Sequence, residues 1–356
     1  MFEFKKLKDI HLEITSKCQA ACPMCERNNH GAMPNPNLIE SDWSLEDFKK
    51  IMSPNLLNQI KSLRFCGNFG DPIINDNLIE MCRYTKLVDK NINIDIHTNA
   101  GARKQEWWQE LASVLTDNDR VHIALDGLED THHLYRINTT YDKVIKNAKA
   151  FIDAGGKAVW AMLIFKHNEH QVEEANRRAN DMNFVSFSVK ASQRFITSLK
   201  FEVYDKNKNI THYLEPASNI DLNYITKEHL DKFELLSKSA EIKCEVKHSK
   251  EVYIDAQKIL SPCCYIAPGK YLYTETNLLK DSYQRVKEQY LMIVESLGGF
   301  EKLNTINNTV EDIINSKEYQ TVWDYYWSNN KPIMCVKSCS KIDNVMRPQD
   351  QYIKKA

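Results

Sequence analysis

Residues 11–25 read HLEITSKCQAACPMC, and in this stretch a short apolar strand runs directly into three closely spaced cysteines. The strand covers residues 11–14, and the loop that follows carries Cys18, Cys22 and Cys25. Three thiolates at this spacing can hold three irons of a 4Fe–4S cube and leave the fourth iron open to another ligand. The stretch therefore predicts an iron–sulfur site at the end of the first strand.

A zinc knuckle completed by His30 is the alternative interpretation of the same loop. Zinc sites, however, prefer four ligands in paired knuckles, and a fourth cysteine is missing nearby. Because both the spacing and the position after a strand suit a cluster, we favour iron over zinc.

Outward from this stretch, strand-like and helix-like segments alternate over about 190 residues. The expected strands are His11–Ile14, Ser62–Phe65, Ile92–Thr98, Val121–Leu125, Ala158–Phe165 and Phe184–Val189. The expected helices are Asp42–Ile60, Asn77–Asp89, Glu106–Leu115, Tyr141–Ala154 and Glu169–Met182. Such alternation predicts an α/β fold with a parallel sheet and right-handed crossovers. Six repeats fall short of the eight of a full barrel, so we expect a partial (β/α)6 barrel with its ligands at the carboxyl ends of the strands.

The pattern changes after Ser192, which suggests three parts: residues 1–195, 196–240 and 241–356. The middle part has no role that we can assign. It begins with a β-hairpin at Phe201–Tyr213 and continues as a polar, partly helical stretch. In the last part we expect two short strands, Val252–Asp255 and Ile259–Leu260, and helices near 282–297 and 309–327.

Composition excludes several classes of protein. Hydrophobic residues make up 42% and charged residues 27% of the 356 residues, an ordinary globular balance, and the net charge is -1. Without a basic excess, neither nucleic acid nor a membrane surface is an expected partner. The longest apolar stretch, residues 158–165, is too short to span a bilayer, and the N-terminus has no signal-peptide core. We therefore expect a cytoplasmic protein whose ten cysteines are not disulfides.

The cysteine motif and the segments at the later strand ends resemble the radical S-adenosylmethionine (radical SAM) superfamily. The resemblance implies that the amino and carboxylate groups of S-adenosylmethionine chelate the open iron. One electron from the cluster then cleaves the sulfonium and yields a 5′-deoxyadenosyl radical, which abstracts a hydrogen atom from the substrate. The cofactor carries the hard chemistry, and the protein aims and shields it.

The segment Phe65–Pro72, which follows the second strand, resembles the GGEP segment of this family, with aspartate in place of glutamate. By this resemblance Gly67, Asn68, Gly70 and Asp71 contact S-adenosylmethionine, and the carboxylate suits its ammonium group. The alternative is an ordinary Gly/Asp-Pro turn.

The ends of the third and fourth strands supply further expected contacts. Thr98 and Asn99 are expected at the methionine part or the ribose, although Asn99 could instead begin a turn with Gly101. In the run that resembles the family's "S-[IL]-D-G … H-x-x-R", Asp126 is expected at the ribose and Arg136 at the carboxylate. The alternative for Arg136 is a surface salt bridge.

Apolar contacts with the adenine complete the expected cofactor site. Met24 occupies the position before the third cysteine, where the family usually has an aromatic residue, and its flexible thioether could pack against the base. The fifth strand, which includes Leu163, is expected to form an apolar wall.

A second group of cysteines lies near the C-terminus and resembles the twitch type of the SPASM/twitch extension, which holds one auxiliary 4Fe–4S cluster. The expected ligands are Cys244, Cys263, Cys335 and Cys339. Cys264 is expected to be the spare thiol, although it could exchange roles with its neighbour. A four-cysteine zinc site is the alternative.

The resemblance implies an oxidising or modifying enzyme that needs an electron donor such as flavodoxin or ferredoxin. We expect a small polar substrate, such as a sugar or cyclitol, that is oxidised or epimerised. The alternative is a ribosomally made peptide. Enzymes that modify such peptides often carry an N-terminal domain that binds the leader peptide, and here the first strand begins only about ten residues from the start, so we consider the peptide second. Dehydrogenation of an alcohol would need a base, for which Arg194 and His167 are the candidates. The alternative for each is an ordinary surface or ligand-positioning residue. A zinc-binding protein without catalytic activity is the hypothesis from another class.

Overall fold

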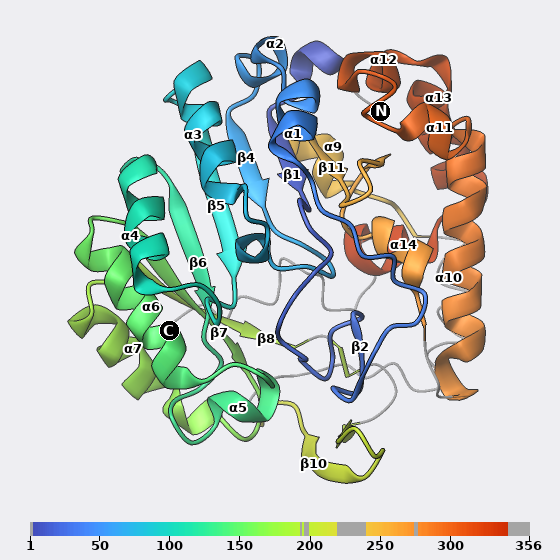
Figure 1. Cartoon of the computed structure of the whole chain (residues 1–356). Coiled ribbons are helices and arrows are strands. Elements are labelled where there is room, and N and C mark those ends of the chain that lie inside the picture. Colours follow the sequence, from blue (N-terminus) through green and yellow to red (C-terminus); the bar gives the residue numbers. More distant parts are fainter. Residues whose placement is uncertain (1–2, 193, 196–198, 219–239, 274–276, 341–356) are drawn as a thin grey trace.

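One eight-stranded sheet organises the computed structural model, which describes residues 3–192, 194–195, 199–218, 240–273 and 277–340 (Figure 1). The strand order is β12-β11-β1-β4-β5-β6-β7-β8. The strands are β1 (Asp9–Leu12), β4 (Ser62–Phe65), β5 (Asn93–Thr98), β6 (Arg120–Ala124), β7 (Ala158–Ile164), β8 (Ser186–Ala191), β11 (Glu251–Ile254) and β12 (Leu260–Ser261).

The six strands expected from the sequence are all present and form a parallel series from β1 to β8. Each neighbouring pair follows in chain order, with a helical crossover between them. This is the α/β partial barrel that the alternating pattern predicted. Because all six strands run in one direction, their carboxyl ends and the loops that follow them meet at one edge of the sheet.

The crossover helices cover one side of the sheet (Figure 1). They are α1 (Leu45–Ile51), α2 (Pro54–Leu57), α3 (Leu78–Val88), α4 (Gln105–Val114), α5 (His132–Tyr135), α6 (Tyr141–Asp153) and α7 (Val172–Asp181). The single helix expected over residues 42–60 is wrong, because the structure divides it into α1 and α2. A Ser44–Asp47 capping box starts α1, whereas Ser53 caps α2 and Pro54 occupies its first turn, where proline is favoured.

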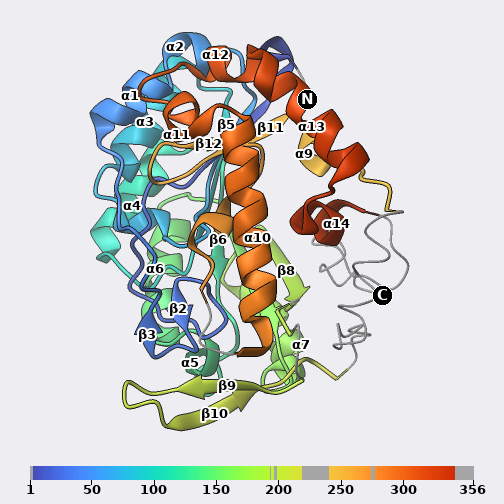
Figure 2. The ribbon, with the colours of Figure 1, turned by 90° about the vertical axis from the view of Figure 1, so that its right-hand side faces the viewer.

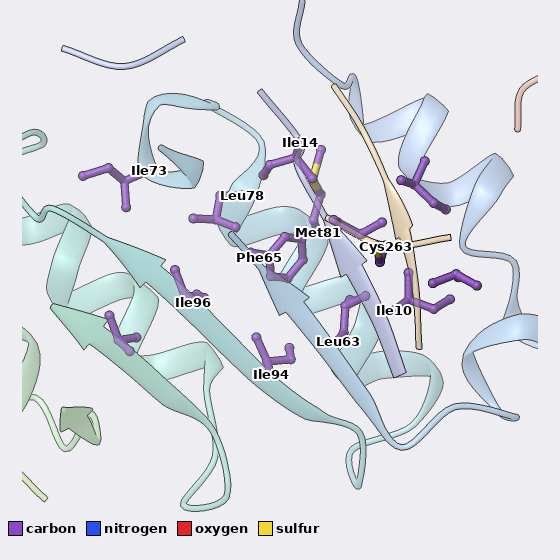
Figure 3. Packing of buried hydrophobic residues seen from close by; sticks show 14 of the residues in the cluster. Ile10, Ile14, Leu63, Phe65, Ile73, Leu78, Met81, Ile94, Ile96 and Cys263 are labelled. Atoms are coloured by element: carbon purple, nitrogen blue, oxygen red, sulfur yellow. The ribbon is translucent and has the colours of Figure 1, made fainter. Parts of the chain in front are cut away.

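The two faces of the sheet differ in chemistry because side chains alternate along each strand. Side chains such as Leu63, Phe65, Ile94 and Ile96 are fully buried toward the helices, as Figure 3 shows. The alternate positions of β4, β5 and β6 are half-buried and carry polar residues. Over these three strands the sheet therefore has an apolar outer face and a largely polar inner face.

The C-terminal part of the chain extends the same sheet. The two expected short strands are present as β11 and β12, but they do not stand apart from the barrel. Strand β11 pairs in parallel with β1, Asp9 opposite Glu251, and β12 pairs with β11 in the antiparallel sense. This pairing covers β1, which would otherwise be an edge strand with unpaired backbone groups.

The expected C-terminal helices are present, although the one expected near 309–327 is divided into two by a break at Ser316, and two hairpins lie outside the main sheet. The helices are α9 (Glu245–Ser249), α10 (Asn277–Ser296), α11 (Gly299–Leu303), α12 (Val310–Asn315), α13 (Lys317–Asn329) and α14 (Ile333–Cys339). The hairpins are β2 (Asn28–Asn29) with β3 (Met33–Pro34), and β9 (Phe201–Tyr204) with β10 (Ile210–Leu214), the second of which the sequence predicted. Helix α10 stands on the other side of the sheet from α3, α4 and α6, and Figure 2 shows it along its whole length.

Two findings bear on the remaining expectations. Residues 196–198 and 219–239, which include most of the partly helical stretch expected after the hairpin, lie outside the described residues. Among the helices that are described, none is both long enough and apolar enough to cross a bilayer.

Candidate functional site

The three N-terminal cysteines lie on the loop that leaves β1 at the carboxyl edge of the sheet. A turn brings the last two together, because the Cys25 amide donates to the Cys22 carbonyl over 3.0 Å. The loop packs on a small apolar cluster of its own, separate from the main core, which includes Met24, Tyr135 and Phe165. The loop is thus fixed by packing rather than by strand pairing.

Two predicted residues from distant parts of the chain reach the thiols of this loop. The Asn99 side-chain amide donates to Cys18 Sγ over 3.5 Å, and the Arg136 guanidinium donates from Nη1 to Cys22 Sγ over 3.6 Å. Burial raises the pKa of the Cys22 thiol, and the positive charge of Arg136 opposes this shift. Since the thiolate is the form that binds metal, a guanidinium at this position favours the ligating state.

Arg136 and Asp126 form a buried ion pair, not the surface salt bridge considered from the sequence. Arg136 Nε donates to Asp126 Oδ2 over 2.6 Å, and the side chains are 19% and 1% exposed. Asp126 Oδ1 accepts the backbone N–H of Leu163 over 2.6 Å. The pair therefore links the end of β6, strand β7 and the cysteine loop, and removing one partner would leave a buried charge uncompensated.

Asp71, Thr98 and Asn99 form one hydrogen-bonded group at the ends of β4 and β5. The Asn99 backbone N–H donates to Asp71 Oδ2 over 2.7 Å, and Thr98 also hydrogen-bonds this carboxylate. Asn99 makes the expected turn too, because Gly101 N–H donates to its Oδ1 over 2.8 Å. Asp71 caps the 3-10 helix Pro72–Ile74, so the Asp-Pro turn is present as well. Burial raises the pKa of the Asp71 carboxyl.

The glycines of the Phe65–Pro72 segment are required by the protein's own backbone. A Cβ atom on Gly70 would lie 1.8 Å from the Thr15 carbonyl oxygen, and one on Gly67 would lie 2.3 Å from the Gly70 carbonyl oxygen. Asn68 donates from its side chain to the Cys264 carbonyl over 3.0 Å. Only glycine allows this close approach of the loop residues 67–71 to the end of β1.

Arg194 contacts the cysteine loop directly, whereas His167 contacts Phe165, a member of the apolar cluster on which the loop packs. Arg194 Nη1 donates to the Met24 carbonyl over 2.6 Å. Burial opposes its charge, but Tyr135 and Cys25 outweigh burial and raise the pKa of the guanidinium. His167 stacks on Phe165 with ring centroids 5.2 Å apart, and burial lowers the pKa of its imidazole to about 4. A neutral imidazole can accept a proton, whereas a charged guanidinium suits positioning, and the choice of a general base stays a prediction.

His30, the alternative zinc ligand considered from the sequence, contacts the β9–β10 hairpin. Its ring stacks on Phe201 with centroids 4.4 Å apart, and its Nδ1 lies 2.7 Å from the Glu202 carbonyl oxygen. The histidine therefore fastens the β9–β10 hairpin to the segment that follows the cysteine loop.

The four C-terminal cysteines predicted as ligands line one cavity, although they come from three separate segments of the sequence. Cys244 precedes α9, Cys263 follows β12, and Cys335 and Cys339 lie one turn apart on α14. Cys264 does not line this cavity. In the part of the chain that the structure describes, no three His, Cys, Asp or Glu side chains are grouped as ligands of a single metal ion would be.

The rest of this cavity is aromatic and aliphatic, with two unusual donors. Trp323 and Trp327 line it. The Nε1 atom of Trp323 is buried without a hydrogen-bond partner among the described residues, whereas the Trp327 indole faces the Cys335 thiol. A buried N–H without a partner is costly, so an acceptor at this position is expected. Thiolate and sulfide are the acceptors that a cluster on these four cysteines would offer, and the residues present therefore fit such a group.

The inner face of the barrel lies next to the cysteine loop and is lined by ionisable side chains. His97 and His122 stack with centroids 4.2 Å apart, and His122 lies 3.3 Å from an Asp95 carboxylate oxygen. Arg64 pairs with Glu251 over 3.0 Å. All of these except Glu251 are only half-buried, so the inner face offers hydrogen-bonding groups to a molecule within the barrel.

The chain is similar to a known protein family and to several solved structures. Residues 12–179 match the model of the radical SAM superfamily. Among curated proteins, none matches the chain. Three similar solved structures are Streptococcus suis SuiB bound to S-adenosylmethionine, native anSMEcpe with bound AdoMet and Cp18Cys peptide, and BtrN in complex with AdoMet and 2-DOIA.

The sequence identities to these structures are low, so the likeness concerns the fold. SuiB is 17% identical over 78% of this chain and 65% of its own, with a TM-score of 0.48. The peptide-bound anSMEcpe is 12% identical over 97% and 91%, with a TM-score of 0.53, and BtrN is 12% identical over 97% and 97%, with a TM-score of 0.44. This chain thus spans about 65% of the length of SuiB.

The family match thus covers residues 12–179, the segment that carries Cys18, Cys22 and Cys25.

Several residues that organise the site escaped the sequence analysis. Glu13 is buried beneath the loop residues 67–71, Gln19 donates to Asn99 Oδ1 over 2.6 Å, and Asn168 donates to the Asp126 carbonyl over 3.1 Å. A carboxylate between the apolar residues of the first strand was the available signal for Glu13. The side-chain amides of Gln19 and Asn168 lie in ordinary turn sequences, which do not indicate a role in the site.

Proposed function

We propose that the chain is a radical SAM enzyme with an auxiliary 4Fe–4S cluster, which acts on a small polar molecule such as a sugar or cyclitol. One observation carries this proposal: two of the three thiols on the loop after β1, those of Cys18 and Cys22, meet an amide and a guanidinium that follow other strands of the sheet. A structural knuckle needs neither group, whereas a reactive centre needs its ligands held in one geometry.

At the first site, each residue has a defined part in this proposal. Cys18, Cys22 and Cys25 hold the cluster, whose open iron and electron supply the radical chemistry when S-adenosylmethionine is bound. Arg136 holds Cys22 in place, and its charge is available to the methionine carboxylate. Asn99 fixes Cys18 and the turn behind it. Met24 and Leu163 are the proposed contacts of the adenine.

The loop residues 67–71 and the ends of the next strands complete the proposed cofactor site. Gly67, Asn68 and Gly70 offer backbone groups, and Asp71 offers a carboxylate beside Thr98. Asp126 would reach the ribose from the end of β6. These roles rest on the resemblance to the family and on the position of every group at the carboxyl edge of the sheet.

At the second site, Cys244, Cys263, Cys335 and Cys339 would ligate the auxiliary cluster. Four protein ligands leave no iron open, so this cluster would accept or relay an electron instead of binding substrate. The residues from 241 onward would form the twitch-type module, residues 1–195 the barrel, and a flavodoxin or ferredoxin would supply the electrons.

A polar substrate is supported by the inner face of the barrel, where Arg64, Asp95, His97 and His122 are half-buried. Such groups can hydrogen-bond the hydroxyls of a sugar or cyclitol, whereas an apolar substrate would offer them no hydrogen bond. A peptide is the second candidate, because the solved anSMEcpe of the same fold carries a bound peptide.

The experiment is an anaerobic assay of 5′-deoxyadenosine formation with the reconstituted protein, S-adenosylmethionine and a chemical reductant. Wild type should release 5′-deoxyadenosine slowly without substrate. We then expect a panel of sugars and cyclitols to stimulate release more than a panel of peptides. Stimulation by peptides alone would replace the substrate proposal, and a protein that binds zinc and releases no 5′-deoxyadenosine would refute the enzyme.

A further inference from the structure

The loop residues 67–71, proposed to bind S-adenosylmethionine, are held by the C-terminal part of the chain as well as by the barrel. The segment 251–271, which comprises β11, β12 and the turns that follow, lies beside β1 in the sheet. Three separate contacts join it to the loop. Each connects groups roughly 190 residues apart in the sequence.

The first contact passes through a buried carboxylate. Glu13 Oε1 accepts the backbone N–H groups of Phe69 and Gly70 over 2.7 and 2.9 Å, and its Oε2 accepts the Tyr253 hydroxyl over 2.5 Å. The residues Glu13 and Tyr253 are 2% and 0% exposed. Hydrogen bonds to a buried carboxylate are among the strong ones in proteins, so this group ties β11 firmly to the loop.

The other two contacts reach neighbouring residues of the loop. Asn68 Nδ2 donates to the Cys264 carbonyl over 3.0 Å, directly beside Cys263. The Phe69 ring meets the Tyr271 ring edge-on, with centroids 5.3 Å apart and planes at 90°. Asn68, Phe69 and Gly70 are thus each anchored by a group that the segment 251–271 supplies or holds in place.

The loop has little freedom to compensate if one anchor is lost. Gly70 packs so closely on the end of β1 that a Cβ atom would lie 1.8 Å from the Thr15 carbonyl oxygen, and a Cβ atom on Gly67 would lie 2.8 Å from Glu13 Oε1. A shift of Glu13 would therefore move the loop itself.

We infer that Tyr253 and Glu13 are positioning residues for S-adenosylmethionine, and that the C-terminal segment 251–271 sets the affinity of the barrel for this cofactor. The inference rests on the proposed function, because it takes the loop residues 67–71 as part of the cofactor site. It assigns to the C-terminal segment a second role besides the one proposed for its cysteines.

The test measures the affinity for S-adenosylmethionine in the full-length protein, reconstituted anaerobically and reduced. The readout is the concentration of S-adenosylmethionine that produces half of the change in the cluster's EPR spectrum. Tyr253→Phe removes only the hydroxyl, and we expect the affinity to fall roughly fivefold to tenfold with the iron content unchanged. The matched control is Tyr141→Phe on α6, which removes a hydroxyl that bonds Arg178 far from the loop.

If Tyr253→Phe folds poorly, a pair of Glu13 variants tests the same inference. Glu13→Gln keeps an acceptor for the Phe69 and Gly70 N–H groups, whereas Glu13→Ala removes it. At equal iron content, Gln should retain most of the affinity that Ala loses.

Three outcomes separate the claims. Wild type that shows no spectral response to S-adenosylmethionine removes the proposed function itself. A wild type that responds, with Tyr253→Phe or with both Glu13 variants unchanged in affinity, overturns this inference and leaves the proposed function standing. A weakened Tyr253→Phe beside an unchanged Tyr141→Phe supports it.

Discussion

The two sets of cysteines in this molecule differ in what surrounds them. The N-terminal set meets polar groups, the amide of Asn99 and the guanidinium of Arg136, at an edge where several loops converge. The C-terminal set lines a cavity closed by indole rings and aliphatic side chains. Polar surroundings suit a centre that binds a charged cofactor, whereas an apolar enclosure suits a centre that only exchanges electrons. The contrast indicates that the polarity of the surroundings, more than the type of ligand, would give two similar clusters different functions.

The largest expected effect comes from removing the first set alone. In the combined variant Cys18→Ala, Cys22→Ala, Cys25→Ala, formation of 5′-deoxyadenosine should disappear, because no iron remains to bind the cofactor. Iron content should fall from about eight to about four per chain, since the second set is untouched. Iron analysis and product analysis check both points. Residual 5′-deoxyadenosine from the triple variant would show that the N-terminal cysteines do not form the centre that binds S-adenosylmethionine.

The next effect separates two adjacent cysteines of the second set. Cys263 lines the cavity, whereas Cys264 does not and only its carbonyl is engaged by Asn68. Cys263→Ala should therefore lose most of the auxiliary cluster's absorption, and Cys264→Ala, the matched control, should keep it. If the losses are reversed, the ligand has been assigned to the wrong neighbour.

A somewhat smaller effect is expected at the ion pair behind the first set. Arg136→Ala leaves the Asp126 carboxylate buried without its partner and removes the donor to Cys22, so we expect the affinity for S-adenosylmethionine to fall by at least tenfold. Arg83→Ala on α3, whose guanidinium binds Glu80 and Glu110 on the exposed surface, is the control and should change nothing. Equal affinity in wild type and Arg136→Ala would contradict this role.

The sequence predicted the barrel well because strand and helix periodicity are local signals. It placed all six strands, and it chose the four cysteines that line the second cavity. It predicted one helix over residues 42–60, whereas Ser53 caps a second helix that begins at Pro54. It did not foresee that β11 would join β1 or that Tyr253 would meet Glu13. These contacts span 240 residues of sequence in the case of the hydroxyl and carboxylate, and no local pattern encodes them.

The pH dependence of stability should report on Glu13. Burial raises the pKa of this carboxyl from 4.5 to about 7, despite the Tyr253, Gly70 and Phe69 donors. Between these two values the folded protein binds more protons than the unfolded chain, so stability falls as pH rises, by up to about 3 kcal/mol. Glu13→Gln cannot ionise, and its melting temperature relative to wild type should therefore increase from pH 6 to pH 8. A difference that is flat with pH, as expected for the exposed control Glu80→Gln, would show that Glu13 titrates normally.

The smallest expected effect concerns the reduction potential of the cluster on the C-terminal cysteines. Trp323 and Trp327 present buried N–H groups to the cavity that the cysteines line, and a cluster on these cysteines would supply sulfur acceptors. Hydrogen bonds to the sulfurs stabilise the reduced cluster and raise its potential. If each bond contributes about 1 kcal/mol, Trp323→Phe or Trp327→Phe should lower the auxiliary potential by about 40 mV and leave the first cluster unchanged. Potentiometric titration followed by EPR measures both clusters, with Trp107→Phe on α4 as the control. Because phenylalanine keeps the apolar enclosure and removes only the donor, an unchanged potential would mean that enclosure alone tunes this centre.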